Sequence, residues 1–315
     1  TIHPVFGIET GFVSNVFYNE NPEPAGILRL MGQISVASLN RQRLDPSAPN
    51  LTDTDGDDRG DFQYKASLRL AYDQPLASSD TITGTGGVGI GAGFKGMVNP
   101  SGRFSFGFDE NFLRMIRASN FETQTNENRD INNLQLTFLY HPPDRSMSGY
   151  LYYRNMIDIF EKTDTLYPNR IDHRIGLHPM WRVFPQTMVY ADFSLGFVDG
   201  LGSSPEAEMK KSSMPLILKA GVTSLLTTKV ALNFAAGYTN GFYANGPSFS
   251  APVFDVDLSY RYSPLGKLQV GYSLAYMDSV NANYYRDHIV RAQVQQLFVP
   301  FALMIEPELH LRQYN

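Results

Sequence analysis

The chain has 315 residues, a net charge of −5 and no Cys. The lack of Cys excludes disulfides and cysteine-based metal sites, and the weakly acidic balance gives no support for nucleic-acid binding. No run of about 18 to 20 apolar residues occurs, so no transmembrane helix is expected. The chain contains 21 Phe, 18 Tyr and 26 Gly beside a single Trp, which favours β-strands with aromatic ends over helices.

Apolar and polar residues alternate along most of the chain, which is the period of a β-strand. The clearest examples are residues 62–73 and the hairpin 254–276, whose turn is Ser-Pro-Leu-Gly-Lys at 263–267. In chain order, the expected strands are 4–17, 26–39, 62–73, 82–94, 102–117, 131–140, 147–159, 171–183, 188–198, 214–223, 229–238, 254–262, 268–276, 286–297 and 301–311.

The length and charge pattern of these strands favour a membrane barrel. Most have roughly 10 to 14 residues, longer than the strands of globular sheets and sufficient for a tilted membrane-spanning strand. Charged residues occupy mid-strand positions opposite the apolar parity, as in a wall with lipid outside and water within. The connections alternate between short and long, as at the two rims of outer-membrane barrels, although the long segment 40–61 falls on the short-turn rim.

We therefore predict an all-β fold, a single antiparallel up-and-down transmembrane β-barrel over residues 1–315 in the bacterial outer membrane. Because bacterial single-chain barrels have an even number of strands, the fifteen segments suggest about sixteen, within a range of about fourteen to eighteen. A soluble all-β protein, such as two sandwiches or a propeller, is the alternative.

Charged side chains on the inward parity are the candidate functional residues, because charged rings tune ion selectivity in pores. Their signs nearly balance, which predicts weak selectivity, and pairs across the lumen can also brace the wall. The inward Tyr150 and Tyr152 are either sugar-stacking platforms or lumen filler. The charged candidates are Arg29, Lys65, Arg69, Arg154, Asp158, Asp172, Arg174, Arg182, Asp192, Lys219, Asp255, Asp257, Arg291, Glu306 and Glu308.

An acidic segment at 53–61 is the candidate metal site. Asp53, Asp55, Asp57 and Asp61 are closely spaced around a glycine, as in loops that wrap calcium with carboxylates. The Glu that would complete an EF-hand is missing, so a solvated acidic loop is the favoured interpretation and calcium the other. No further cofactor is expected.

The sequence contains no catalytic constellation. Its six His residues are scattered, and no G-x-S-x-G motif occurs. Barrel lipases carry a Ser and a His on the outer face. His173 and His288 fall on the apolar parity but have no evident Ser partner in the sequence. We predict that the protein is not an enzyme, with a barrel hydrolase as the less favoured alternative.

Several short stretches carry a family resemblance. Residues 11–22, Gly-Phe-Val-Ser-Asn-Val-Phe-Tyr-Asn-Glu-Asn-Pro, resemble the start of the outer-membrane porin-2-like β-barrels. The hairpins 216–240 and 254–276 resemble that family's repeated Ala-Gly-Tyr and Leu-Ser-Tyr-Arg-Tyr strands, as does Asn-Tyr-Tyr-Arg-Asp-His-Ile at 283–289. The family includes barrels associated with exopolysaccharide secretion.

The resemblance implies a channel, and together with the barrel pattern it predicts a porin that passes small polar solutes or a polysaccharide chain through an aqueous lumen. The expected partners are the lipid bilayer and lipopolysaccharide, with periplasmic or envelope export proteins as further candidates. The alternative is a structural or docking barrel that is plugged by its own loops or by a partner protein.

Overall fold

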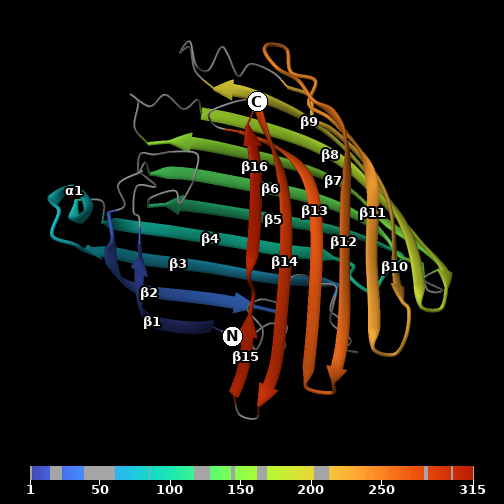
Figure 1. The fold of residues 1–315 in the computed structure, drawn as a ribbon, viewed down its shortest axis with the longest axis horizontal. Coiled ribbons are helices and arrows are strands. Elements are labelled where there is room, and N and C mark those ends of the chain that lie inside the picture. Colours follow the sequence, from blue (N-terminus) through green and yellow to red (C-terminus); the bar gives the residue numbers. More distant parts are fainter. Residues whose placement is uncertain are drawn as a thin grey trace. The chain divides into compact units, whose positions relative to one another are not determined.

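The computed structural model describes residues 2–14, 23–38, 61–84, 86–116, 128–142, 146–161, 169–201, 213–279, 283–298 and 301–314. These residues form β-strands and one short helix (Figure 1). The strands are β1 (Ile2–Val13), β2 (Ala25–Ala37), β3 (Phe62–Leu76), β4 (Gly87–Val98), β5 (Phe104–Met115), β6 (Arg129–Tyr140), β7 (Met147–Phe160), β8 (Asn169–Phe184), β9 (Thr187–Leu201), β10 (Leu216–Leu225), β11 (Val230–Asn240), β12 (Ser250–Ser263), β13 (Gly266–Asp278), β14 (Tyr284–Phe298), β15 (Phe301–Ile305) and β16 (Glu308–Tyr314). In the part of the chain that is described, no helix is long and apolar enough to span a membrane.

The strands form one 16-stranded antiparallel sheet, in which β1 to β15 are neighbours in the order of the chain and β16 pairs with β14. This up-and-down order confirms the predicted fold class. The sixteenth strand arises within the last expected segment, 301–311, which the structure divides at Pro307. Because proline has no N–H to give to the ladder, β15 ends before it and β16 begins after it, and both strands pair with β14.

The described chain divides into two compact units. The first contains β1 to β5 and nearly all of β6, the second contains β10 to β16, and β7, β8 and β9 contribute to both. The first unit consists of Thr1–Leu139, Tyr152–His173 and Asp199–Glu208, and the second of Tyr140–Leu151, Arg174–Val198 and Met209–Asn315.

The fourth expected strand, 82–94, is wrong at its beginning. Residues Asp80–Thr83 form the helix α1, and β4 starts only at Gly87. Ile82 is 2% exposed and packs against Ala25 at the start of β2. Its apolar side chain therefore supports the helix, and Gly84 follows as the helix C-cap.

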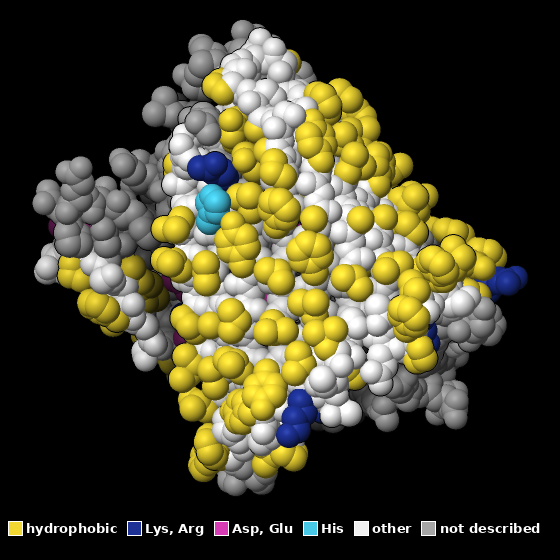
Figure 2. Space-filling model, turned by 45° about the vertical axis from the view of Figure 1, so that its right-hand side comes forward, with side chains coloured by type: hydrophobic (Ala, Val, Ile, Leu, Met, Phe, Trp, Pro, Cys, Tyr) yellow, Lys and Arg dark blue, Asp and Glu magenta, His cyan; other side chains and the backbone are white. Residues whose placement is uncertain are grey.

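Each unit's sheet has two chemically different faces, which we call the apolar face and the polar face. Large apolar side chains on the apolar face are strongly exposed, such as Leu68 and Leu258 at 46% each and Leu218 at 40%. Figure 2 shows hydrophobic side chains spread widely over one face, with few charged side chains among them. Contiguous apolar surface of this kind is rare on soluble monomers, so the apolar face requires a non-aqueous neighbour.

Candidate functional site

In the first unit, Arg29 is the centre of a cross-strand clamp on the polar face. Glu9, Arg29 and Asp73 lie in register on β1, β2 and β3. Arg29 donates from Nε to Asp73 Oδ1 at 2.6 Å and from Nη2 to Oδ2 at 2.8 Å, and its Nη1 lies 3.4 Å from Glu9 Oε2. The bidentate geometry is the strong form of this ion pair, so the three residues brace three neighbouring strands.

Asp158 near the end of β7 is a buried anion, with no exposed surface. It accepts hydrogen bonds from Arg129 on β6 and from Nε of Arg170 on β8, the latter at 3.0 Å. The Arg129 guanidinium also lies 5.3 Å from the ring centroid of Phe160. Two partly buried guanidinium groups thus hold one buried carboxylate. Arg129 and Arg170 could not be recognised from the sequence as partners of Asp158, because alternation alone does not show which charges meet.

Four other charged candidates belong to the first unit. Asp172 is buried, at 6% exposed. Lys65, Arg69 and Arg154 lie on β3 and β7, and within the described ranges none of them forms an ion pair. A pair outside the candidate set, Lys95 Nζ with Asp109 Oδ2 at 2.9 Å, joins β4 to β5.

Arg114 departs from the alternation, because it lies on the apolar parity near the end of β5. It reaches beyond the strand, where its Nη2 donates to Glu161 Oε2 at 3.0 Å, and its Nη1 donates to the Val88 carbonyl at 2.7 Å. Asn128 Nδ2 donates to the same Glu161 oxygen at 2.9 Å. The Arg114 guanidinium lowers the pKa of Glu161, which follows the last residue of β7. This cluster ties together the ends of four strands, β4 to β7.

In the second unit, five charged residues cross the polar face of β9 to β14, and we call them the charge belt: Asp192, Lys219, Asp255, Asp257 and Arg291. Lys219 Nζ lies 2.5 Å from Asp255 Oδ2, and Arg291 Nη2 lies 3.3 Å from Asp257 Oδ1. Asp192 is in register with Lys219 on the neighbouring strand. The structure therefore brings five of the candidate charges into one band.

Glycines lie directly beneath these pairs. Gly271 on β13 is in register with both Asp257 and Arg291. A Cβ at this position would overlap Asp257 Oδ1 and would lie 3.2 Å from Arg291 Nε. Gly237 on β11 is likewise in register with Lys219, and a Cβ there would overlap the Leu218 carbonyl. The missing side chains let ion pairs pass over an intervening strand.

A row of three stacked rings adjoins the belt. The ring centroid of His178 on β8 lies 4.8 Å from that of Tyr150 on β7 and 5.2 Å from that of Tyr190 on β9. His178 Nδ1 is 3.9 Å from Asp192 Oδ1. Tyr190 donates its hydroxyl proton to Asn233 Oδ1 at 3.1 Å. Because His178 covers one face of the Tyr150 ring, that face is not a platform for a sugar.

Four further candidates belong to the second unit, and one of them, Glu308 on β16, is in register with Arg291 of the belt. Arg174 is half-buried, and the exposed Arg182 donates its backbone N–H to the Ser146 carbonyl. Glu306, between β15 and β16, accepts a hydrogen bond from the side chain of Gln293. Glu308 Oε1 lies 2.6 Å from His310 Nε2.

His310 links the last strand to β14. Its Nδ1 lies 2.8 Å from Asp287 Oδ2, and Arg312 Nε donates to the same oxygen at 3.1 Å. Asp287 is 2% exposed. The sequence alone indicates no role for Asp287 or His310, because only the register of β16 on β14 shows that they meet.

The predicted calcium segment falls mostly outside the described residues. Asp53, Asp55 and Asp57 belong to 39–60, which the structure does not describe, and Asp61 is exposed, with its carbonyl accepting from the Asn99 N–H. In the described ranges, no three His, Asp or Glu side chains are placed to share a metal ion. Calcium binding at 53–61 stays a prediction.

The two histidines of the apolar parity contact phenol groups. His173 Nδ1 lies 2.7 Å from the Tyr153 hydroxyl and 3.2 Å from Asn155 Nδ2. His288 Nδ1 lies 2.9 Å from the Tyr272 hydroxyl. Within the described part of the chain neither imidazole has a serine partner, so the arrangement needed for a serine hydrolase is not assembled there.

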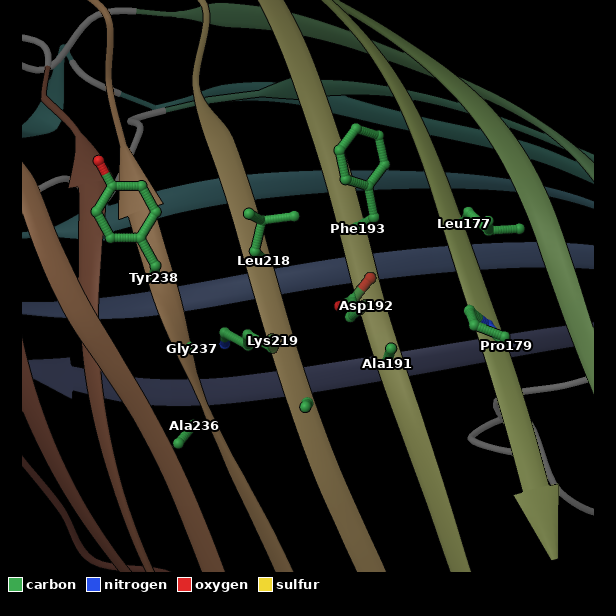
Figure 3. A pocket seen from close by; sticks show the side chains of 11 residues that line it. Leu177, Pro179, Ala191, Asp192, Phe193, Leu218, Lys219, Ala236, Gly237 and Tyr238 are labelled. Carbon is green, nitrogen blue, oxygen red and sulfur yellow. The ribbon is translucent and has the colours of Figure 1, made fainter.

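A shallow groove of about 520 Å³ lies over β8 to β11 (Figure 3). Its floor contains Ala191, Ala220 and Ala236, which are in register on three strands. Leu218 and Tyr238, which are also in register with each other, are larger side chains that line the groove beside these alanines. Because these residues share the apolar parity, the groove lies mainly on the apolar face, although Asp192 and Lys219 of the charge belt are also among its lining residues.

No protein-family model matches the chain, and no curated protein is similar to it in sequence. Among solved structures, the chain is similar to the siderophore receptor PirA from Pseudomonas aeruginosa, with 8% identity and a TM-score of 0.52 over 97% of this chain and 55% of the receptor. The ferric enterobactin receptor PfeA from the same bacterium has 9% identity and a TM-score of 0.47, covering 97% and 53%. OccAB4 from Acinetobacter baumannii has 10% identity and a TM-score of 0.45, covering 100% and 92%.

The chain thus spans about half of the length of the two receptors. Its likeness to PirA concerns the fold alone, and it agrees with the antiparallel up-and-down order of the strands. The chain is therefore an all-β protein with the antiparallel up-and-down strand order of β-barrel folds.

Proposed function

We propose that this chain is a channel in the bacterial outer membrane and that the polar face of its sheet lines a water-filled interior. The observation that carries the proposal is the charge belt. Its paired side chains, Lys219, Asp255, Asp257 and Arg291, are 21% to 43% exposed, while Leu218 and Leu258 beside them in sequence are exposed on the opposite face.

A sheet with these two faces is stable only between two different solvents. Charges are costly to bury in hydrocarbon but are well solvated by water, and exposed apolar side chains have the reverse preference. Lipid against the apolar face and water against the polar face satisfies both, which is the arrangement of an outer-membrane barrel. We propose that residues 1–315 act as one such barrel, with bilayer lipid and lipopolysaccharide as its surroundings.

The proposed transport is diffusion past the wall charges, without a covalent step. The strong clamps at Arg29 and Asp158 fix their side chains to the wall, so they shape the interior, whereas the belt remains partly exposed to the passing solute. Small polar solutes and ions fit this wall best. A polysaccharide chain is the second solute class, and Tyr150 gives it little support because His178 covers one of its ring faces.

Conductance recording in planar bilayers tests the proposal. Protein refolded in detergent, with folding checked by its mobility on unheated gels, is expected to give stepwise currents that a heat-denatured sample does not give. Soluble oligosaccharides added to one side test for the second solute class by blocking the current. Silence from well-folded protein would contradict an open channel and would favour a plugged or partner-docking barrel.

A further inference from the structure

The charge belt contains one carboxylate more than its cations can neutralise. It has the carboxylates Asp192, Asp255 and Asp257 against the cations Lys219 and Arg291. Asp255 and Asp257 are each in an ion pair, whereas the ion-pair contact of Asp192 among the described residues is His178, 3.9 Å away. With His178 neutral the belt therefore has a net charge of −1, and with His178 protonated it has none.

His178 is placed so that a change in its charge acts directly on Asp192. Its side chain is 16% exposed and is held between the Tyr150 and Tyr190 rings. The polar groups that face it are the Tyr150 hydroxyl from β7, the Tyr190 hydroxyl and the Asp192 carboxylate from β9. On its own strand, Arg174 and Arg182 are the nearest charges of the polar parity, each four residues away along the chain.

This setting suits both protonation states of the imidazole. Aromatic ring faces attract a cation through their quadrupole, and the nearby carboxylate attracts it through its charge. Stacking also holds the neutral ring in the same position, since flat rings pack well at these distances. Histidine is the side chain whose charge ordinarily changes between pH 5 and 8, so the belt can gain or lose its excess charge without a movement of the backbone.

We propose that His178 and Asp192 form a proton-responsive selectivity element of the channel. While the imidazole of His178 is neutral, the unneutralised Asp192 gives this part of the wall a preference for cations. When the imidazole is protonated, it neutralises Asp192 and the preference is lost. The inference rests on the proposed channel function and names the residues that determine which ions pass.

Reversal potentials in a salt gradient, measured at pH 8 and pH 5 across single channels, test this inference. The wild-type cation-to-anion permeability ratio is expected to fall between pH 8 and pH 5. His178→Phe keeps a flat ring between Tyr150 and Tyr190 but has no proton to gain, so its ratio at pH 5 should equal its ratio at pH 8. Asp192→Asn should already show the lower ratio at pH 8.

His310→Gln is the matched control, because His310 is another polar-face histidine but contacts Asp287 on β14 and Glu308 on its own strand, not Asp192. This variant should keep the wild-type pH dependence. A His178→Phe channel with the wild-type pH dependence, or a wild-type ratio that does not change with pH, would overturn the inference while leaving the channel standing. Absence of current from folded wild-type protein would overturn the channel and the inference together.

Discussion

The side chains of Asp257 and Arg291 meet although a whole strand lies between them. Asp257 is on β12 and Arg291 on β14, and Arg291 Nη2 lies 3.3 Å from the Asp257 carboxylate. The contact passes over Gly271 of β13, which is in register with both residues. Backbone glycines on the polar face therefore decide which charges can pair, as much as the charges themselves do.

Alanine at three glycines should have graded effects on stability. Gly237→Ala places a methyl group against the Leu218 backbone, which cannot move without its strand, so we expect a loss of about 2 kcal/mol or more in the free energy of unfolding. In Gly271→Ala the obstacle is the movable Asp257 carboxylate, so only a partly exposed ion pair is lost, about 1 kcal/mol or less.

Gly11→Ala is the control for this series, because a Cβ there meets nothing within 4 Å. It should change the free energy of unfolding by no more than about 0.5 kcal/mol. Urea titration of the refolded variants measures all three values. An equal loss for Gly237→Ala and Gly11→Ala would show that the close approach at Gly237 is not real.

Asp158→Asn should be among the most destabilising conservative changes in the first unit. It leaves the guanidinium groups of Arg129 and Arg170 at a buried site without their anion, and breaking a buried ion pair in this way costs about 3 to 5 kcal/mol. Asp109→Asn is the matched control, since its pair with Lys95 is well exposed and is worth about 1 kcal/mol at most. Equal losses in urea titrations would contradict the buried clamp.

Glu161 should make the protein's stability depend on pH in the acid range. Arg114 lowers the pKa of Glu161 from its ordinary value of 4.5, so the folded state holds the carboxylate in its charged form more strongly than the unfolded state does. The resulting stabilisation is fully present above pH 4.5 and is lost as the pH falls through the lowered pKa.

The difference in unfolding free energy between wild type and Glu161→Gln, measured from pH 3 to pH 7, checks this prediction. The wild-type advantage should be constant at the upper end of this range and should shrink toward pH 3. An advantage that stays the same at every pH would show that the Arg114–Glu161 contact does not distinguish the folded from the unfolded protein.

Arginine substitutions at two consecutive residues of β12 should have opposite consequences for membrane insertion. Leu258→Arg puts a charge on the exposed apolar face, where an arginine facing lipid costs about 2 to 4 kcal/mol near the middle of the bilayer. Ser259→Arg puts the same charge on the polar face and should fold into lipid vesicles with nearly wild-type yield. Equal folding yields for the two variants would contradict the assignment of the faces.

The alternation of side chains was sufficient to predict the strands and their faces. Alternation is informative because each strand, such as the segment around Leu68 and Arg69, presents its two faces to two different solvents. Neighbouring residues point to opposite faces, so every second residue must suit the same solvent. Local exceptions were harder to see. Ile82 looked like the beginning of a strand but serves α1, and the break at Pro307 was hidden within an otherwise regular segment.

The partners of the charged residues could not be predicted, because the sequence contains the charges but not the register of the strands. The meeting of Asp158 with Arg129 and Arg170, and of Asp287 with His310, depends on which residues of neighbouring strands lie side by side. The stacking of His178 between two tyrosines is of the same kind. The role of His178 can be inferred only when its neighbours on β7 and β9 are known.

The most direct test of the two-solvent account uses single cysteines, which the natural chain lacks entirely. Ser259→Cys and Thr223→Cys lie on the polar face of β12 and β10, and Leu258→Cys and Val222→Cys lie beside them on the apolar face. In lipid vesicles, a small membrane-impermeant thiol reagent should label the first two rapidly and leave the second two unlabelled until detergent or urea is added. Equal labelling of both pairs in intact vesicles would contradict a wall that has water on one face and lipid on the other.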